Sequence, residues 1–287
     1  MTAGRTLLRF GPISRPVAFT GCDGLVESVA ARLCGWTVAP WLSADAPAPV
    51  ISIAARGGKF SLISDFIAGE ETYDDATDAV CALLAEVIMA MSAEAPDTLF
   101  LHAGAAVVNG RLIVYPARGK TGKSTLTAQL AAQGARVFSD DVVPVSLDTR
   151  RARALGIEPH LRLPLAGTLA ADERRWIEDH TAVANRRTIY VGLPRSGPGA
   201  LAPLGEECAI GAFVLLDRGE GIAPELAPCP RPDIMKLIIR QHFGAARPAA
   251  DLLPGLKALI ESAPCFRLRY SGGSEAASLL RRMEKTT

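Results

Sequence analysis

The sequence predicts an α/β (α+β) fold in which a mixed sheet carries a glycine-rich loop and follows a small α+β unit. Three observations support this prediction. Apolar runs typical of strands alternate along the chain with segments whose apolar residues recur at helical spacing. Residues 102–145 have the pattern of a strand, a glycine loop, a helix and a second strand. Within that region, Asn109-Gly110 marks a tight hairpin between two apolar runs.

Composition and charge narrow the class of protein. Of the 287 residues, 49% are hydrophobic and 21% are charged, and the net charge is +1. This composition is typical of a globular protein, and a near-neutral charge gives no long-range attraction to nucleic acid or to an anionic membrane. The first ten residues lack the apolar core of a signal peptide, and no apolar run approaches the length of a transmembrane helix. We therefore expect no nucleic-acid partner and no membrane partner.

The six cysteines are scattered along the chain and form no C-x-x-C pair. Such a distribution favours a reducing compartment, in which cysteines act as small core hydrophobes. The sequence therefore predicts a cytoplasmic protein without structural disulfides.

Residues 1–95 predict a small α+β unit without a catalytic motif, either a scaffold or a dimerisation layer. Asp23 is placed to cap the first helix and Gly35 to end it, whereas Arg56-Gly57-Gly58 joins two strands as a hairpin. The expected elements are a strand over Thr6–Phe10, a helix over Asp23–Cys34, strands over Val50–Ala54 and Lys59–Ser64, and a helix over Ala79–Met91.

Proline and acidic residues at 94–97 interrupt the helical pattern, so a second domain is expected over 96–287. Besides the glycine loop and its flanking elements, helices and strands continue to the end of the chain. The expected strands are Thr98–Leu101, Ala105–Val108, Leu112–Tyr115, Thr188–Leu193, Ile210–Leu216 and Cys265–Tyr270. The expected helices are Asp172–His180, Asp233–Phe243, Leu252–Ser262 and Gly273–Met283.

The glycine loop, Ala117-Arg-Gly-Lys-Thr-Gly-Lys-Ser124, matches the phosphate-binding pattern G-x-x-x-x-G-K-[ST] except that Ala117 replaces the first glycine. Glycines let backbone N–H groups approach a phosphate chain, and the helix that follows presents the positive end of its dipole. Lys123 would reach the β- and γ-phosphates, and the Ser124 hydroxyl would join a Mg²⁺ shell. An ordinary strand–turn–helix is the alternative. The expected nucleotide-binding residues are Ala117, Arg118, Gly119, Lys120, Thr121, Gly122, Lys123, Ser124 and Thr125.

Asp140 and Asp141 follow an apolar run at the predicted carboxyl end of a strand, where α/β sheets present ligand-binding groups. One carboxylate could hold Mg²⁺, and the other could accept a proton from an attacking hydroxyl. The alternative is a solvated turn.

Two further residues are candidates for the same site. His102, on a strand next to that of the glycine loop, could steady an aspartate by hydrogen bonding or simply end its strand. Arg162, in a segment held extended by prolines, could bind a phosphate or pair with an acid. His160, His180 and His242 show no ligand spacing and are expected to be structural.

His102 with Gly104, the loop Ala117–Ser124 and Ser139-Asp140-Asp141-Val142 resemble the HPr kinase/phosphorylase family, in particular its short HPr serine kinase-like members. The resemblance is specific over residues 102–145 and looser to about Pro194. It implies a fold similar to the nucleotide-binding part of phosphoenolpyruvate carboxykinase.

The resemblance also implies roles and ligands. ATP and Mg²⁺ would be the cofactors, with Lys123 and Ser124 as the phosphate and metal contacts. Asp140 would be the base toward a substrate serine, Asp141 would help hold the metal, and His102 would support the aspartate. The split between the two aspartates stays open. Arg162 falls near the family's arginine-bearing strand.

The family has G-x-S-G-x-G-K-S, whereas Ala117, Gly119 and Lys120 occupy the first, third and fourth positions here. The acceptor is therefore open between HPr, a peptide precursor of the lasso type and a small molecule. We expect a serine kinase acting on a protein or peptide; a non-catalytic nucleotide sensor is the alternative from another class. A homo-oligomer is compatible with the apolar N-terminal helices.

Overall fold

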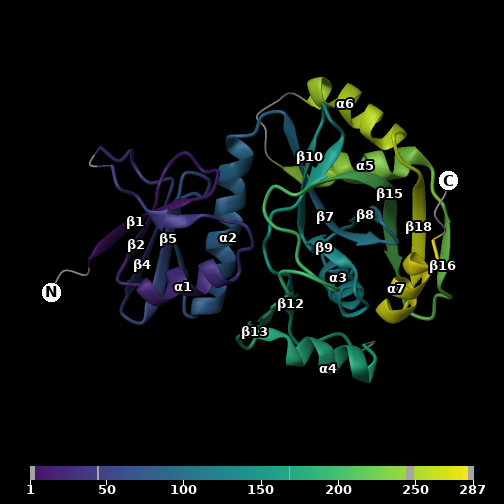
Figure 1. Ribbon diagram of the computed structural model, residues 1–287, viewed down its shortest axis with the longest axis horizontal. Helices are drawn as coiled ribbons and strands as arrows, with labels where there is room; N and C mark the ends of the chain where they lie inside the picture. The colour runs from purple at the N-terminus through teal and green to yellow at the C-terminus, as the bar shows by residue number, and fades with distance from the viewer. Residues whose placement is uncertain (1–3, 44, 168, 244–248, 284–287) are drawn as a thin grey trace.

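The computed structural model describes residues 4–43, 45–167, 169–243 and 249–283. It contains mixed sheets and helices, as the predicted α+β class requires. A first sheet with its helices and a larger second sheet with its own helices lie side by side, with helix α2 (Ala76–Ala93) between them (Figure 1). The predicted domain boundary at residues 95 and 96 falls between α2 and strand β7 (Thr98–Val108), and it stays a prediction.

The first sheet has six strands in the order β3-β1-β2-β4-β5-β6. All neighbours are antiparallel except β2 and β4, which are parallel. The hairpin predicted at residues 56–58 is confirmed, because Arg56 pairs with Lys59 across two glycines with positive φ. The strands are β1 (Arg5–Phe10), β2 (Val17–Thr20), β3 (Val38–Pro40), β4 (Ile51–Arg56), β5 (Lys59–Ser64) and β6 (Glu71–Tyr73).

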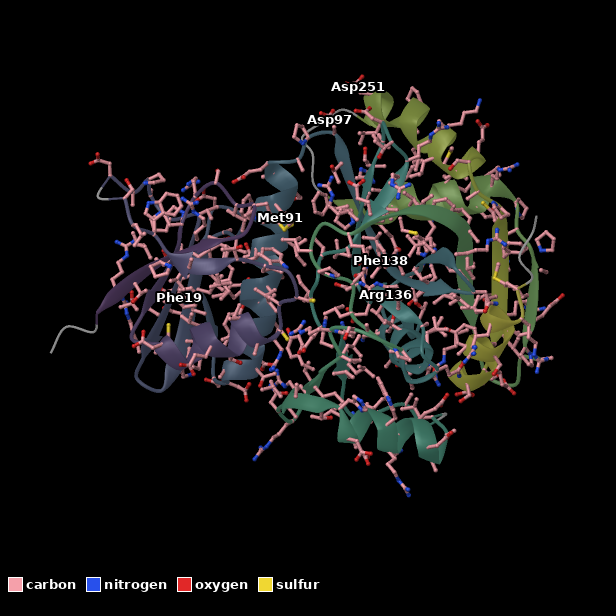
Figure 2. All side chains as sticks on the ribbon, viewed as in Figure 1. Phe19, Met91, Asp97, Arg136, Phe138 and Asp251 are labelled. Atoms are coloured by element: carbon pink, nitrogen blue, oxygen red, sulfur yellow. The ribbon has the colours of Figure 1, made fainter. Side chains whose placement is uncertain are left out.

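Two helices cover this sheet and close a core that contains Phe19 (Figure 2). Asp75 caps α2, because its carboxylate accepts hydrogen bonds from the N–H groups of Thr77 and Asp78 at 2.7 and 3.1 Å. The predicted cap of α1 (Asp23–Ala31) is wrong by one residue. Asp23 is the first helical residue, and Cys22 occupies the cap position without a side-chain hydrogen bond.

Helix α2 also corrects an expectation about apolar runs. By length and composition alone it would suffice to cross a membrane, contrary to the prediction that no run approaches that length. In the structure, 56% of this helix is buried inside the molecule, and its inner face packs on β4, β5 and β6. A helix that is buried against a sheet can be as apolar as a helix that spans a membrane, which explains the composition of α2.

The second sheet follows the order β11-β10-β7-β8-β15-β18-β16, with β9 and β17 also paired to β7. The Asn109-Gly110 hairpin is confirmed, with both residues at positive φ between β7 and β8. The two strands predicted over residues 98–108 are one continuous strand, so His102 lies inside β7 rather than at its end. The remaining strands are β8 (Arg111–Pro116), β9 (Arg136–Ser139), β10 (Val142–Ser146), β11 (Arg151–Arg153), β15 (Glu207–Arg218), β16 (Glu225–Pro228), β17 (His242–Phe243) and β18 (Cys265–Tyr270).

Helices cover both faces of this sheet, as the burial along β8 shows. Leu112 and Val114 pack in a core shared with α5 and α6, whereas Ile113 and Tyr115 pack in a core shared with α3 and α7. Alternate residues of one strand therefore serve two separate cores. The helices are α3 (Lys123–Ala132), α5 (Arg231–Gln241), α6 (Ala249–Glu261) and α7 (Gly273–Arg281). A three-stranded sheet of β12 (His160–Arg162), β14 (Thr188–Val191) and β13 (Thr181–Ala184) lies beside α4 (Ala171–Asp179).

Strand direction brings the sequence motifs together at one edge of the second sheet. β7 is antiparallel to both β8 and β9, so these two strands run in the same direction. β15 is parallel to β8, and β18 is parallel to β15. The carboxyl ends of β8, β9, β15 and β18 therefore meet at a common edge, where sheets of this kind bind ligands.

Main-chain hydrogen bonds are among the contacts that join the first sheet and its helices, the first body, to the rest of the molecule, the second body. The Cys34 N–H donates to the Gly156 carbonyl at 2.7 Å, the Glu158 N–H to the Arg32 carbonyl at 3.0 Å, and the Leu204 N–H to the Cys34 carbonyl at 2.8 Å. Arg32 and Glu158 also form a buried ion pair, with Nε and Oε2 2.6 Å apart but poorly aligned for a hydrogen bond. The first body is thus fixed to the segment that leads into β12.

Gly104 on β7 has no room for a side chain, and this generates a prediction. A methyl group at this position would lie 2.1 Å from the ring of Tyr115, which is fully buried and hydrogen-bonded to Thr127 on α3. We expect Gly104→Ala to destabilise the protein by about 1–3 kcal/mol, the usual cost of overpacking a core. The measurement is chemical denaturation. The matched control is Gly24→Ala on α1, where nothing lies within 4 Å and the change should be neutral or slightly stabilising. Equal unfolding midpoints for the two variants would contradict the prediction.

Candidate functional site

The glycine loop spans residues 117–122, between the end of β8 and the start of α3. Ala117 is buried and is not among the residues with positive φ, so its methyl group is accommodated without strain. Lys120 and Gly122 do have positive φ, and Gly122 is the cap residue of α3. Arg118, Gly119 and Lys120 are exposed. The loop thus has the strand–loop–helix context that the sequence predicts.

Hydrogen bonds from neighbouring elements and from within the loop hold its backbone in place. The Tyr270 hydroxyl at the end of β18 donates to the Thr121 carbonyl at 2.9 Å, and the Thr121 hydroxyl donates to the Arg118 carbonyl at 2.6 Å. The Lys123 ammonium is buried and donates to the Ala117 carbonyl at 3.0 Å. Burial lowers the pKa of Lys123, while Asp141 and Asp140 act in the opposite direction. The lysine therefore lies close to both aspartates.

The aspartate pair follows β9 in a turn held by Ser139. The Ser139 hydroxyl oxygen accepts hydrogen bonds from the N–H groups of Asp141 at 3.1 Å and Val142 at 2.9 Å. This turn separates the environments of the two carboxylates. The Asp140 side chain is only 6% exposed, whereas the Asp141 side chain is 47% exposed.

Asp140 faces the start of α3 and the strand β12. Its Oδ2 accepts a hydrogen bond from the His160 N–H at 3.2 Å and lies 3.8 Å from Nδ1 of the same histidine. The Ser124 hydroxyl also lies close enough to this carboxylate to favour its ionised form. Burial raises the pKa of Asp140, and the neighbouring Asp141 charge adds to the rise against the opposing effects of His160 and Ser124.

Asp141 faces His102 of β7, and the supporting role suggested for this histidine stays a prediction. The His102 Nε2 lies 2.8 Å from Oδ1 of Asp141. Burial by itself would raise the pKa of Asp141. The hydrogen bond from His102 and the nearby charges of His102, His160 and Lys123 outweigh that effect and lower the pKa. The two carboxylates thus have opposite pKa shifts.

β12 brings Arg162 and His160 to the site. Arg162 is exposed and lies close enough to Lys123 to lower the pKa of that ammonium. His160, expected to be structural, is instead the residue whose N–H and ring face Asp140. Residues two apart on a strand lie on the same face, and the sequence predicts an extended segment around Arg162. That prediction was the available signal that His160 would lie on the same face as Arg162.

Behind His160, the site reaches the first body. The His160 and Tyr190 rings lie 5.8 Å apart, and the Tyr190 hydroxyl donates to Cys81 Sγ of α2 at 3.0 Å. Burial raises the pKa of the Cys81 thiol, in keeping with a packed, unreactive cysteine. All six cysteines lie in the described residues and are free.

The oxygen atoms of Ser124, Asp140 and Asp141 at this edge are of the kind that Mg²⁺ prefers as ligands. Among the described residues, no group of three or more His, Cys, Asp and Glu side chains forms a ready-made metal site. Mg²⁺ is commonly held by one or two carboxylates together with substrate phosphates and water, so this donor set fits Mg²⁺ only with a phosphate ligand present.

Comparison with known proteins adds little to this geometry. No known family model and no curated protein matches the chain. Among solved structures, the Hpr(Ser) kinase/phosphatase from Coxiella burnetii is similar over 63% of this chain and 93% of that chain, with 12% sequence identity and a TM-score of 0.30. A superposition this loose establishes neither a shared overall fold nor a shared activity, so function has to be argued from the residues of this chain.

The contact between His102 and Asp141 predicts a pH-dependent contribution to stability. Because the folded pKa of Asp141 is lowered, the contribution is complete above the unfolded value of about 3.9 and is lost as pH falls through the folded pKa. At this half-exposed position it is worth about 1 kcal/mol or less. We expect His102→Gln to raise the pKa of Asp141, measured by carboxyl ¹³C NMR, whereas His180→Gln just after α4 should leave it unchanged. An unchanged Asp141 pKa in His102→Gln would contradict the assignment.

Proposed function

We propose that this chain is a kinase that binds ATP and Mg²⁺ at its glycine loop and transfers the γ-phosphoryl group to a hydroxyl. The observation that carries the proposal is the meeting of two motifs at one edge of the second sheet. The Ser124 hydroxyl of the loop–helix motif lies close enough to the Asp140 carboxylate of the aspartate turn to favour the ionised form of that carboxylate. Phosphate binding alone would need only the loop, whereas two adjoining carboxylates can hold a metal ion and accept a proton.

The loop and the first turn of α3 supply groups that suit a phosphate chain. The first N–H groups of a helix have no partners within it, and the cap residue Gly122 has no side chain in front of them. Lys123, which now donates to the Ala117 carbonyl, would move its ammonium to the β- and γ-phosphate oxygens. The exposed Arg118 and Lys120 add positive charge at the loop.

We assign the metal to Asp140 and Ser124. Mg²⁺ prefers hard oxygen ligands, and a carboxylate beside the hydroxyl at the start of α3 provides two of them. Bound there with the nucleotide, the ion would neutralise charge on the transferring phosphoryl group. A nearby cation would also favour the ionised form of Asp140, whose pKa burial now raises.

We assign the base to Asp141, which reverses the division of roles implied by the family resemblance. Its carboxylate is half-exposed, so an incoming hydroxyl can reach it, and His102 orients it at 2.8 Å. In the proposed step, Asp141 takes the proton of the acceptor hydroxyl as that oxygen bonds to the γ-phosphorus. The bond from the γ-phosphorus to the bridging oxygen of ADP breaks in the same displacement.

The proposed acceptor is a serine of a protein or peptide. Support comes from the exposure of Asp141, since a hydroxyl carried on another polypeptide can approach this carboxylate from solvent. Arg162, exposed beside the lysine, would contact the transferring phosphate or an anionic group of the acceptor.

The metal and base assignments predict different defects for the two aspartates. With γ-labelled ATP and a cell lysate, Asp141→Asn should retain ATP binding and lose phosphotransfer by roughly 10²-fold or more, since a general base is removed. Asp140→Asn should instead raise the Mg²⁺ concentration needed for ATP binding by about tenfold or more. Calorimetric titration of ATP at several Mg²⁺ concentrations measures the second effect.

The matched control is Asp148→Asn, on the exposed turn between β10 and β11, which should behave as wild type. ATP binding without any transfer by the wild type would identify a nucleotide sensor. Transfer to the low-molecular-weight fraction of the lysate, and to no polypeptide, would identify a small-molecule kinase. Unchanged ATP affinity in Lys123→Ala would overturn the nucleotide site itself.

A further inference from the structure

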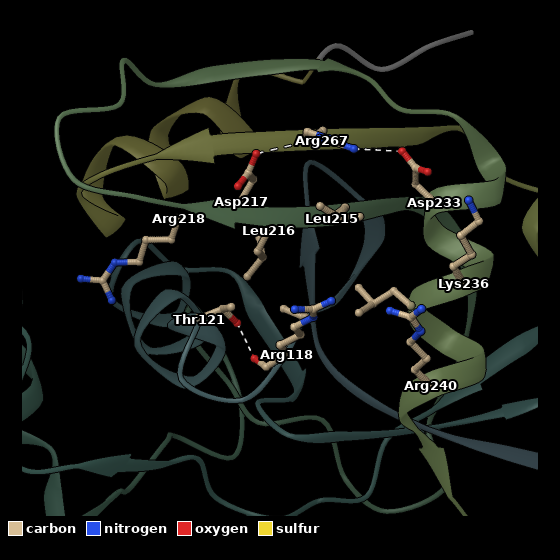
Figure 3. A pocket seen from close by; sticks show the side chains of 12 residues that line it. Arg118, Thr121, Leu215, Leu216, Asp217, Arg218, Asp233, Lys236, Arg240 and Arg267 are labelled. Atoms are coloured by element: carbon tan, nitrogen blue, oxygen red, sulfur yellow. Dashed lines mark hydrogen bonds and ion pairs between the residues drawn. The ribbon is translucent and has the colours of Figure 1, made fainter.

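A second feature of the same edge has no part in the proposed transfer. A cavity of about 450 Å³ opens beside the loop and is bounded by Ala117, Arg118 and Thr121, by the end of β15, and by α5 (Figure 3). Neither aspartate of the pair lines it. Its volume is within the range of pockets that hold small organic ligands.

The position of the cavity follows from the strand order. β8, which leads into the loop, lies between β7 and β15. The aspartate turn lies on the β7 side of the loop, whereas the cavity lies on the β15 side. A linear ligand whose phosphates lie in the loop and whose reacting end faces the aspartates would therefore have its other end in the cavity.

We propose that this cavity binds the base and ribose of the nucleoside triphosphate whose phosphates the loop holds. The inference rests on the proposed function, because it places the rest of the molecule that the loop would bind. The cavity thereby assigns nucleotide recognition to β15 and α5, more than 80 residues after the loop in the sequence.

Apolar side chains form a surface suited to a base. Leu215 and Leu216 at the end of β15 and Leu237 on α5 line the cavity. Leu215 and Leu237 are only partly buried, so covering them with a planar ring would remove further apolar area from water. Among the lining residues no side chain is aromatic, so stacking on a base would fall to arginine guanidinium groups.

Charge in the cavity suits the part of a nucleotide that lies next to its phosphates. Five lining side chains are cationic and two are carboxylates, and both carboxylates lie near Arg267, Asp233 at 2.9 Å and Asp217 at 4.0 Å. Arg118 on the loop and Arg240 on α5 extend toward one another across the cavity (Figure 3). Within the described part of the chain, neither guanidinium has an ion-pair or hydrogen-bond partner. They would contact the α-phosphate and the ribose, and one face of the base.

The inference is tested by comparing the affinities of two probes, Mg-ATP and Mg-tripolyphosphate. Tripolyphosphate carries the phosphates without a nucleoside. The variant is Leu237→Trp, which fills the cavity from a partly buried position. Isothermal titration calorimetry should show ATP affinity reduced by about tenfold or more, with tripolyphosphate affinity within about twofold of wild type. Retained tripolyphosphate binding also shows that the variant is folded.

The matched control is Ile239→Trp, which adds the same ring on the exposed side of α5 and should leave both affinities unchanged. Equal weakening of both probes by Leu237→Trp would show that the cavity belongs to the phosphate site, and no weakening of ATP would show that the nucleoside lies elsewhere. Either result overturns the inference. Failure of the proposed function looks different, because wild type would then bind neither probe, or Lys123→Ala would bind both normally.

Discussion

The antiparallel pairing of β7 with both β8 and β9 is the constraint on which the candidate site depends. Two strands that are each antiparallel to a third must run in the same direction, so the loop after β8 and the aspartates after β9 reach the same edge. His102 on β7 precedes Ala103, which pairs with Pro116 at the end of β8, and His102 itself pairs with Val142 just after the aspartates. It therefore lies near both the loop and the aspartate turn. The packing of Tyr115 against Gly104 and Thr127 then holds α3 in register with that edge.

The two adjacent carboxylates have different environments because one turn points them to different neighbours. Asp140 is directed into the protein, where its negative charge is poorly solvated and is met by Ser124 and His160. Asp141 is directed toward solvent and His102. The two neighbouring carboxylates thus differ in burial and in hydrogen-bond partners, while the charge of Asp141 still raises the pKa of Asp140. A buried carboxylate and a solvent-exposed carboxylate are suited to different chemistry. This difference is the basis for assigning metal binding to Asp140 and proton transfer to Asp141.

The sequence predicts local features well because their signals lie within a few residues. The Asn109-Gly110 hairpin, the start of α3 at Lys123 and the strand ending before Asp140 all depend on such short-range patterns. His160 is different, because its contact with Asp140 spans 20 residues and depends on where β12 lies in space. The wall of the cavity made by β15 and α5 depends on parallel pairing across about 100 residues. No periodicity in a single sequence indicates such pairings.

The junction between the two bodies, where residues 32–34 meet residues 156–158 and 204, affects which substitutions the chain can accept during evolution. Main-chain hydrogen bonds join residues 32–34 to residues 156–158 and 204, and such bonds do not depend on which side chains are present. Gly35 and Gly156 are exceptions, because a methyl group would lie 2.7 Å from Cβ of Pro203 at the first position and 2.1 Å from the Cys34 carbonyl oxygen at the second. Other residues near this junction can therefore be substituted without loss of these main-chain hydrogen bonds, provided that both positions keep their glycines. Main-chain hydrogen bonds of this kind can be retained in distant homologues whose sequences are no longer recognisably similar.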